Sequence, residues 1–367
     1  MHAKETSMRV HPSIASCLTS LLLLVSTAAH ANSDVEANEA NGLHIGVNAK
    51  PIKRPAPRYP GTELAAGRQG WVQLSYVVTP DGEVIDPVVE DSSGSSSFEK
   101  QALSAVKRWS YEPATWDGKP VQQCETKVMI TFLVEGTDTQ VTRKFHSRYK
   151  KIAKIIDEGN LDEATELIDN LVADMNLSLA ETGWVWTLRA RVAGLAGDQG
   201  AQLKALRKAT ANNGRWADAK VYPSLLLVRT ALELQDGNLS AALETYEVLL
   251  ETGFDHPQME KLKPHVDSVR ELVASDKALA VPARIGAKSD CVDCGTNWHY
   301  EPLRRRFSLA DVKGDLREIE FRCSWQRAVD KADAGMTWEV PEDWGDCSII
   351  VFGEPGTTFS LLELPSA

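Results

Sequence analysis

Two cysteines separated by two residues, Cys291 and Cys294, form the motif with the clearest capacity for chemistry. A dithiol at this spacing supports redox exchange when a helix N-terminus lowers the pKa of its first thiol. The residues that follow, Gly295 to Trp298, carry no helical pattern of apolar residues. Cys323 and Cys347 stand apart on strand-like segments, so no second close pair completes a zinc site. A structural disulfide between Cys291 and Cys294 is therefore favoured over a redox pair or a metal site.

The other cysteines of the expected mature chain fit the same interpretation. Cys323 and Cys347 form the natural second bridge, although spacing alone leaves the connectivity open. Cys124 stands far from the others and is expected to remain a thiol.

No other arrangement of residues indicates catalysis. The 8 histidines form no pair at metal-ligand spacing, and neither a Ser/His/Asp pattern nor a nucleophile elbow is present. No glycine-rich loop joins a strand to a helix to hold phosphate. The sequence therefore predicts a protein that is not an enzyme and has no catalytic residue, cofactor or metal.

Length, composition and charge limit the remaining classes. A chain of 367 residues exceeds one ordinary domain, and 43% hydrophobic residues suffice for buried cores. The formal net charge is −11, without a block of basic residues. An acidic chain of this kind is unsuited to binding phosphate backbones, which excludes nucleic acid as the expected partner.

The N-terminus, residues 1–31, resembles an export signal. Lys4 and Arg9 precede an apolar run from Ile14 to Ala29, which ends in the small-residue cleavage pattern Ala29-His30-Ala31. The run is interrupted by polar residues and shorter than the roughly 20 residues that cross a bilayer. We expect a cleaved signal peptide; the alternative is a retained single anchor in the inner membrane. Residues 32–58, with prolines and no periodic apolar spacing, are expected to form a linker.

Residues 59–136 are predicted to form a small β-β-α-β sheet domain. Gly70 to Val78 alternates like a strand, a turn follows, and Val84 to Glu90 supplies the second arm of a hairpin. Pro87 cannot donate to a neighbouring strand, so it must face outward or sit at a bulge. A helix with one apolar stripe comes next, and Thr126 to Val134 forms the last strand.

These residues carry a family resemblance. Seven short motifs in order resemble the C-terminal domain of TonB proteins: Tyr59-Pro60, Gly70-Trp71-Val72, Pro80-Asp81-Gly82, Ser92-Ser93-Gly94, Ala102-Leu103 with Val106, Trp109 to Ala114, and Asp117 to Val121. The resemblance covers less than a quarter of the chain.

The resemblance implies a function in the periplasm. TonB proteins couple a proton-driven inner-membrane motor to outer-membrane receptors that import siderophores and other nutrients, and their C-terminal domain adds a short receptor segment to its last strand. The residues that match this partner-binding region are Arg58, Tyr59, Pro60, Thr126, Val128, Ile130, Thr131 and Phe132. The implied partners are outer-membrane receptors or other envelope proteins, and the motor.

Several departures favour an alternative without energy coupling. The domain is followed by a long further stretch of chain, the leader resembles a cleavable one, and the proline stretch is short for the family. Ser26 and His30 reproduce the spacing of a Ser/His pair in the TonB anchor, but His30 lies inside the cleavage pattern. The alternative is a periplasmic scaffold that holds partners without transducing energy.

The remaining chain is predicted to form two further units. Residues 140–280 are helical, and Gly159, Gly197 and Gly237 begin similar turns spaced 38 and 40 residues apart, which resembles degenerate tetratricopeptide-type repeats. Residues 287–367 read as a small all-β cap with strands at 319–325, 347–352 and 358–364. The overall expectation is an α+β multidomain protein.

Overall fold

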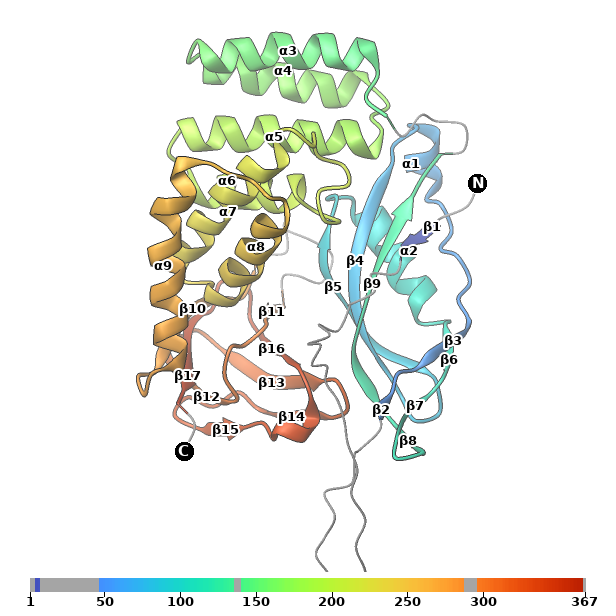
Figure 1. Cartoon of the computed structure of the whole chain (residues 1–367). Coiled ribbons are helices and arrows are strands. Elements are labelled where there is room, and N and C mark those ends of the chain that lie inside the picture. The colour runs from blue at the N-terminus through green and yellow to red at the C-terminus, as the bar shows by residue number, and fades with distance from the viewer. Residues whose placement is uncertain (1–3, 7–45, 135–139, 287–295, 366–367) are drawn as a thin grey trace, which may run out of the picture.

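The computed structural model describes residues 4–6, 46–134, 140–286 and 296–365. The described chain forms three packed regions (Figure 1). We call them the sheet module (residues 46–134), the helical region (140–275) and the β sandwich (279–365).

The sheet module is built on a hairpin and a third strand. Its antiparallel sheet has the order β1-β9-β4-β5, and helix α2 packs on one face. The bounds are β1 Lys4–Thr6, α1 Gly61–Ala65, β4 Gly70–Val78, β5 Val84–Ser92, α2 Ser96–Val106 and β9 Gln123–Phe132. Alternate residues of β4 and β9 point into the core beneath α2, as the period of two predicts.

A bulge bends β5 at the position that the sequence analysis singled out. Asp86 has φ of 46°, and the pairing of β4 with β5 shifts register between Ser75 and Val77. The neighbouring Pro87 therefore sits at a bulge, as predicted, where no ladder hydrogen bond is lost.

The expected linker at residues 32–58 is partly a piece of the sheet module. Strand β2 (Gly46–Val47) pairs with β7 (Ala114–Trp116), and β8 (Lys119–Val121) completes this three-stranded sheet. Strand β3 (Lys50–Lys53) pairs with β6 (Ser110–Glu112) in a separate two-stranded sheet. The prolines obscured this, because proline is tolerated in strands that pair on one side only. The last strand, expected at Thr126 to Val134, spans Gln123–Phe132 instead.

Seven helices form the described helical region, as three antiparallel hairpins and a final helix. Their bounds are α3 Arg143–Asp157, α4 Leu161–Asp174, α5 Leu179–Leu195, α6 Gln199–Ala209, α7 Tyr222–Asp236, α8 Leu239–Glu251 and α9 Pro257–Ala274. Successive helices pack against one another, and α3 and α4 lie at the end farthest from the β sandwich (Figure 1).

The three hairpins share one turn. Gly159, Gly197 and Gly237 have φ of 81°, 77° and 77°, and each ends a helix in the left-handed conformation. The residue after each glycine donates its amide to a carbonyl five residues earlier, which closes the same C-terminal cap three times. The repeat seen in the sequence is therefore a repeat of backbone geometry.

The β sandwich consists of two four-stranded antiparallel sheets, ordered β10-β17-β12-β15 and β11-β16-β13-β14, with one apolar core between them. The bounds are β10 Leu279–Arg284, β11 Asn297–Tyr300, β12 Arg306–Lys313, β13 Leu316–Cys323, β14 Arg327–Lys331, β15 Thr337–Glu339, β16 Cys347–Gly353 and β17 Thr358–Leu364, with a 3-10 turn at Glu342–Trp344. Strand β10 pairs with β17 and so belongs to the sandwich. It begins at Leu279, inside the stretch 140–280 that was expected to be helical.

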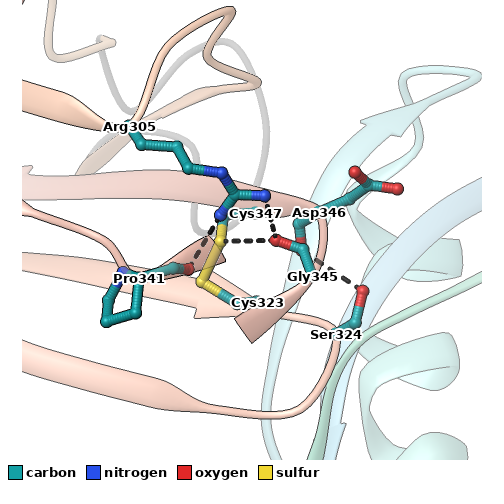
Figure 2. Close-up of a disulfide and its surroundings, with 7 residues drawn as sticks. All are labelled: Arg305, Cys323, Ser324, Pro341, Gly345, Asp346 and Cys347. Carbon is teal, nitrogen blue, oxygen red and sulfur yellow. Dashed lines mark hydrogen bonds between the residues drawn. A yellow bond between two sulfur atoms is a disulfide. The ribbon is translucent and has the colours of Figure 1, made fainter. Parts of the chain in front are cut away.

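A disulfide joins Cys323 to Cys347, which lie opposite each other on β13 and β16 (Figure 2). Arg305 holds the loop before β16 by donating to the carbonyl oxygens of Pro341 and Gly345, both at 3.0 Å. Cys124 is fully buried on β9 as a thiol. The other expected bridge, Cys291 to Cys294, lies outside the described residues.

Among the described residues, no helix has the length and apolar character needed to cross a bilayer.

The shared turn is tested by Gly197→Ala. A Cβ at this position meets no atom within 4 Å, so the expected loss of about 1–2 kcal/mol in the free energy of unfolding comes only from the left-handed backbone. Gly200→Ala in the first turn of α6 is the matched control; it should be neutral or stabilising by up to about 1 kcal/mol. Urea denaturation measures both, and equal effects would contradict the role given to Gly197.

Candidate functional site

Strand β9 directs part of its backbone away from the sheet. Trp71 on β4 lies opposite Thr131. The Trp71 carbonyl accepts from Ser93 at 2.9 Å and its amide donates to Ser93 Oγ at 3.1 Å, so both groups point toward β5. Thr131 is therefore a position where β9 does not exchange hydrogen bonds with β4 and its own N–H and C=O point outward. The backbone N–H and C=O of Met129, two residues away, point in the same direction.

The outer edge of β9 accepts an antiparallel strand. The segment Lys4–Thr6 pairs with it, with Lys4 opposite Thr131 and Thr6 opposite Met129 (Figure 1). Residues of the expected leader thus occupy the edge to which the family adds a receptor segment. The outer edge of β9 therefore pairs with an antiparallel strand of the same chain.

The site residues expected from the resemblance lie in two places. Val128, Ile130 and Phe132 turn their side chains into the core and are at most 5% exposed, so they present backbone only. Thr131 is buried on the opposite face, and the hydroxyl of Thr126 is buried without a hydrogen-bond partner.

The segment before α1 meets β9 through Tyr59. Its ring packs edge-on against Phe132 and Phe98, with centroids 5.8 and 5.6 Å apart, and its hydroxyl donates to the carbonyl of Arg68. Burial, and then the nearby charge of Glu63, raise the pKa of Tyr59 to about 12. Of its neighbours, Arg58 is exposed and Pro60 half-buried.

The helical region covers the face of the sheet opposite α2. Trp71 stacks on Trp216 with ring centroids 5.8 Å apart, and Met129 and Leu179 complete this apolar contact. Lys208 on α6 approaches the rings of Trp71 and Trp186, at 5.8 and 5.6 Å from their centroids. The contact therefore combines apolar packing with cation–π attraction.

Lys208 also ties α6 to β5. Its ammonium donates to Asp91 Oδ1 at 3.0 Å and to the carbonyl oxygen of Ser92, and the residue is only 8% exposed. A nearly buried ammonium is stable because these acceptors replace water.

The β sandwich covers the rest of that face. Arg322 and Glu320 on β13 form an ion pair of 2.7 Å, and both side chains are 1% exposed. Arg322 donates across the interface to the Asp86 carbonyl at 2.9 Å, and Arg327 pairs with both Glu320 and the Asp86 carboxylate. The backbone carbonyl at the β5 bulge is therefore an acceptor for the sandwich.

No pattern in the sequence indicates this interface. Glu320 and Arg322 alternate with apolar residues and look like the solvent face of a half-buried strand, but that face contacts the sheet module. Trp325, the last residue of the strand expected at 319–325, lies beyond β13 and packs on Trp116 with centroids 5.3 Å apart. A Cβ on Gly46 would lie 2.7 Å from the Trp325 ring, so this close approach requires glycine.

Ionisable groups gather where the three regions meet. His299 Nε2 lies 3.6 Å from Glu90 Oε1, and Lys127 on β9 pairs with Glu301. Burial lowers the pKa of His299, and the opposing effect of Glu90 is smaller. Burial, followed by the charge of Glu301, raises the pKa of Glu244 on α8. The charge at this junction therefore depends on pH through His299 and Glu244.

Comparison with known proteins identifies one part of the chain. Residues 55–134 match the family model described as Gram-negative bacterial TonB protein C-terminal. The chain therefore carries a TonB C-terminal domain, which confirms the family resemblance for the sheet module.

Curated relatives match a part of the chain. Protein TonB of Pseudomonas aeruginosa is 34% identical over 86 residues, which are 23% of this chain and 25% of the relative. Protein TonB of Escherichia coli is 31% identical over 93 residues, 25% of this chain and 36% of the relative. The chain thus spans only about a quarter to a third of these proteins.

Two solved structures are similar to a part of the chain. The TonB C-terminal domain of Pseudomonas aeruginosa, determined by solution NMR, is 26% identical, covers 25% of this chain and 91% of its own, and has a TM-score of 0.21. The TonB2 protein of Vibrio anguillarum is 31% identical, covers 29% and 94%, and has a TM-score of 0.20.

The buried ion pair is tested by Glu320→Gln. Arg322 would lose its anionic partner inside the interface, while Arg327 would keep only Asp86, and we expect a loss of about 3–5 kcal/mol in the free energy of unfolding. Glu318→Gln, at an exposed position of the same strand, is the matched control and should change stability by less than about 0.5 kcal/mol. Similar losses in both variants would show that Glu320 carries no special interaction.

The junction predicts a pH dependence with a defined sign. Because the pKa of His299 is lower in the folded protein, only the unfolded chain takes up the proton as pH falls below about 6.5. The free energy of unfolding should therefore decrease from that point, by up to about 1.4 kcal/mol per pH unit, until His299 protonates in the fold. His299→Gln should flatten this slope relative to the wild type in urea melts between pH 7 and 5; an unchanged slope would contradict the assignment.

Proposed function

We propose that this chain is a periplasmic protein of TonB type that binds extended segments of outer-membrane receptors by strand addition along β9. The observation that carries the proposal is the outward backbone of Met129 and Thr131, which already pairs with an antiparallel strand. Strand addition draws affinity from main-chain hydrogen bonds, so an available edge is its essential requirement.

The covered faces support the choice of this edge. One face of the sheet lies under α2, and the other is covered by Trp216, Lys208 and the Glu320–Arg322 pair. Side chains on those faces cannot reach a partner without opening the core. The β9 edge is the part of the sheet that remains suited to a main-chain partner.

Two versions of this function differ in energy coupling. In the first, residues 1–31 stay in the inner membrane, and the module transmits force from a proton-driven motor during nutrient uptake. In the second, the leader is removed and the protein is a scaffold that holds envelope partners. The extensive packing of the module on two further regions favours the scaffold, because force applied at the module would also load those interfaces. We adopt the scaffold version, with tetratricopeptide-like hairpins as its second binding module.

The state of the N-terminus distinguishes the two versions. Mass spectrometry of the protein from fractionated envelopes should find a chain that starts at Asn32 in the periplasmic fraction. An intact N-terminus in the inner-membrane fraction would overturn the scaffold version and support energy transduction.

Strand addition itself is tested by proline. Thr131→Pro removes an outward donor and places a ring against the incoming strand, so binding of receptor N-terminal peptides should fall below detection in calorimetry. Thr131→Ala keeps the backbone and should bind within about twofold of the wild type. A chain without residues 1–31 should bind more tightly, since Lys4–Thr6 no longer competes.

Circular dichroism and urea melts must show that Thr131→Pro is folded. Ile130→Pro is the comparison, because its amide points toward β4 and its replacement should destabilise the sheet. If folded Thr131→Pro binds the peptides as the wild type does, the edge of β9 is not the binding site.

A further inference from the structure

Helix α3 has a charge opposite to that of the whole protein. Its sequence contains six cationic residues and one anionic residue, whereas the chain carries a formal net charge of −11. The helix lies at the outer end of the helical region, with its apolar residues packed inward on α4 and α5 (Figure 1). The positive charge is therefore concentrated on one element at one end of the molecule.

Five of the six cationic residues share one exposed face. Counting 100° per residue, they fall within one arc of the helix, and all five are exposed: Arg143, Lys144, Lys150, Lys151 and Lys154. The sixth, Arg148, is half-buried and pairs with Asp174 on α4 at 3.5 Å. The stripe extends for about 16 Å along the helix axis, and the exposed Ser147 lies among its cationic residues. Within the described residues, only Lys154 of these five forms an ion pair, with Glu158 at 3.5 Å. Among the residues that the structure describes, the other four form no ion pair, and their charges are solvated.

A depression lies along this stripe. Its volume is about 380 Å³, and it is lined by Val141, Arg143, His146, Ser147 and Lys150. Two cations and a hydroxyl at its rim suit an anionic group of phosphate size. Ion pairs with phosphate are favourable because guanidinium and ammonium groups supply several donors.

We propose that the exposed face of α3 binds the anionic headgroups of a lipid bilayer. A straight stripe of exposed like charges complements a flat surface of uniform charge better than it complements a folded or peptide partner. Four to eight basic residues on one amphipathic helix give electrostatic binding to anionic lipid. Because the rest of the chain is acidic, binding through α3 also fixes which end faces the membrane. The inference is independent of the β9 edge.

Vesicle sedimentation of the full chain tests the proposal. Wild-type protein should bind vesicles of phosphatidylglycerol and phosphatidylcholine more strongly than vesicles of phosphatidylcholine alone, and the difference should vanish at about 500 mM salt. Vesicles of phosphatidylcholine alone are the control for insertion of the apolar run near the N-terminus, because that insertion does not require anionic lipid.

The triple variant Lys144→Glu, Lys150→Glu, Lys151→Glu should lower the partition into anionic vesicles by about 100-fold. The matched control, Lys100→Glu, Lys107→Glu, Lys277→Glu, changes the net charge equally at exposed positions outside α3 and should retain most of the binding. Equal losses in the two variants would mean that only net charge matters and would overturn the assignment to α3.

Two other results would also overturn it. The wild type could fail to prefer anionic vesicles, yet bind an acidic polypeptide such as polyglutamate through α3; the stripe would then be a protein-binding surface. Alternatively, sedimentation velocity could reveal salt-sensitive self-association that the triple variant loses, without binding to vesicles. The acidic helix α4 of a second copy would then be the partner.

Discussion

The protein is organised around the antiparallel sheet β1-β9-β4-β5, whose strands β9, β4 and β5 are covered on both faces. A small antiparallel sheet normally keeps one face in water, but here α2 covers one face and two further regions cover the other. The contacts that seal the second face are few and specific: the Trp71–Trp216 stack, Lys208 on β5, and the Glu320–Arg322 pair beneath the Asp86 bulge. With its faces sealed, the sheet has the backbone edge of β9 as the proposed contact with an extended partner.

Charge has different roles inside and outside this assembly. At the junction, buried ions are stable because each finds partners: Arg322 and Arg327 outweigh the effect of burial and lower the pKa of Glu320. Its charge therefore stabilises the fold above the ordinary glutamate range and is lost when pH falls below it. On α3, by contrast, four cations have no partner in the described fold and remain available to an anionic surface. The same residue types thus fix the interfaces and mark an outward-facing surface.

Local patterns in the sequence were sufficient to predict many of the helices and strands, but not the contacts between the regions that these elements form. The period of two placed β4, the bulge at Pro87 followed from its missing amide, and three glycines marked three equivalent helix ends. The sequence could not indicate that Glu320 and Arg322 are buried, because an alternating strand looks the same whether its polar face meets water or another domain. It also missed β2 and β3, since short edge strands that contain proline resemble a linker.

Residue-resolved hydrogen exchange on β9 is the most direct test of strand addition. In the chain without residues 1–31, the amides of Met129 and Thr131 should exchange quickly, whereas those of Ile130 and Phe132 should exchange slowly because they bond to β4. Adding a receptor N-terminal peptide should slow Met129 and Thr131 selectively. If the peptide binds while these two amides keep their exchange rates, and protection arises elsewhere, the proposed binding edge is wrong.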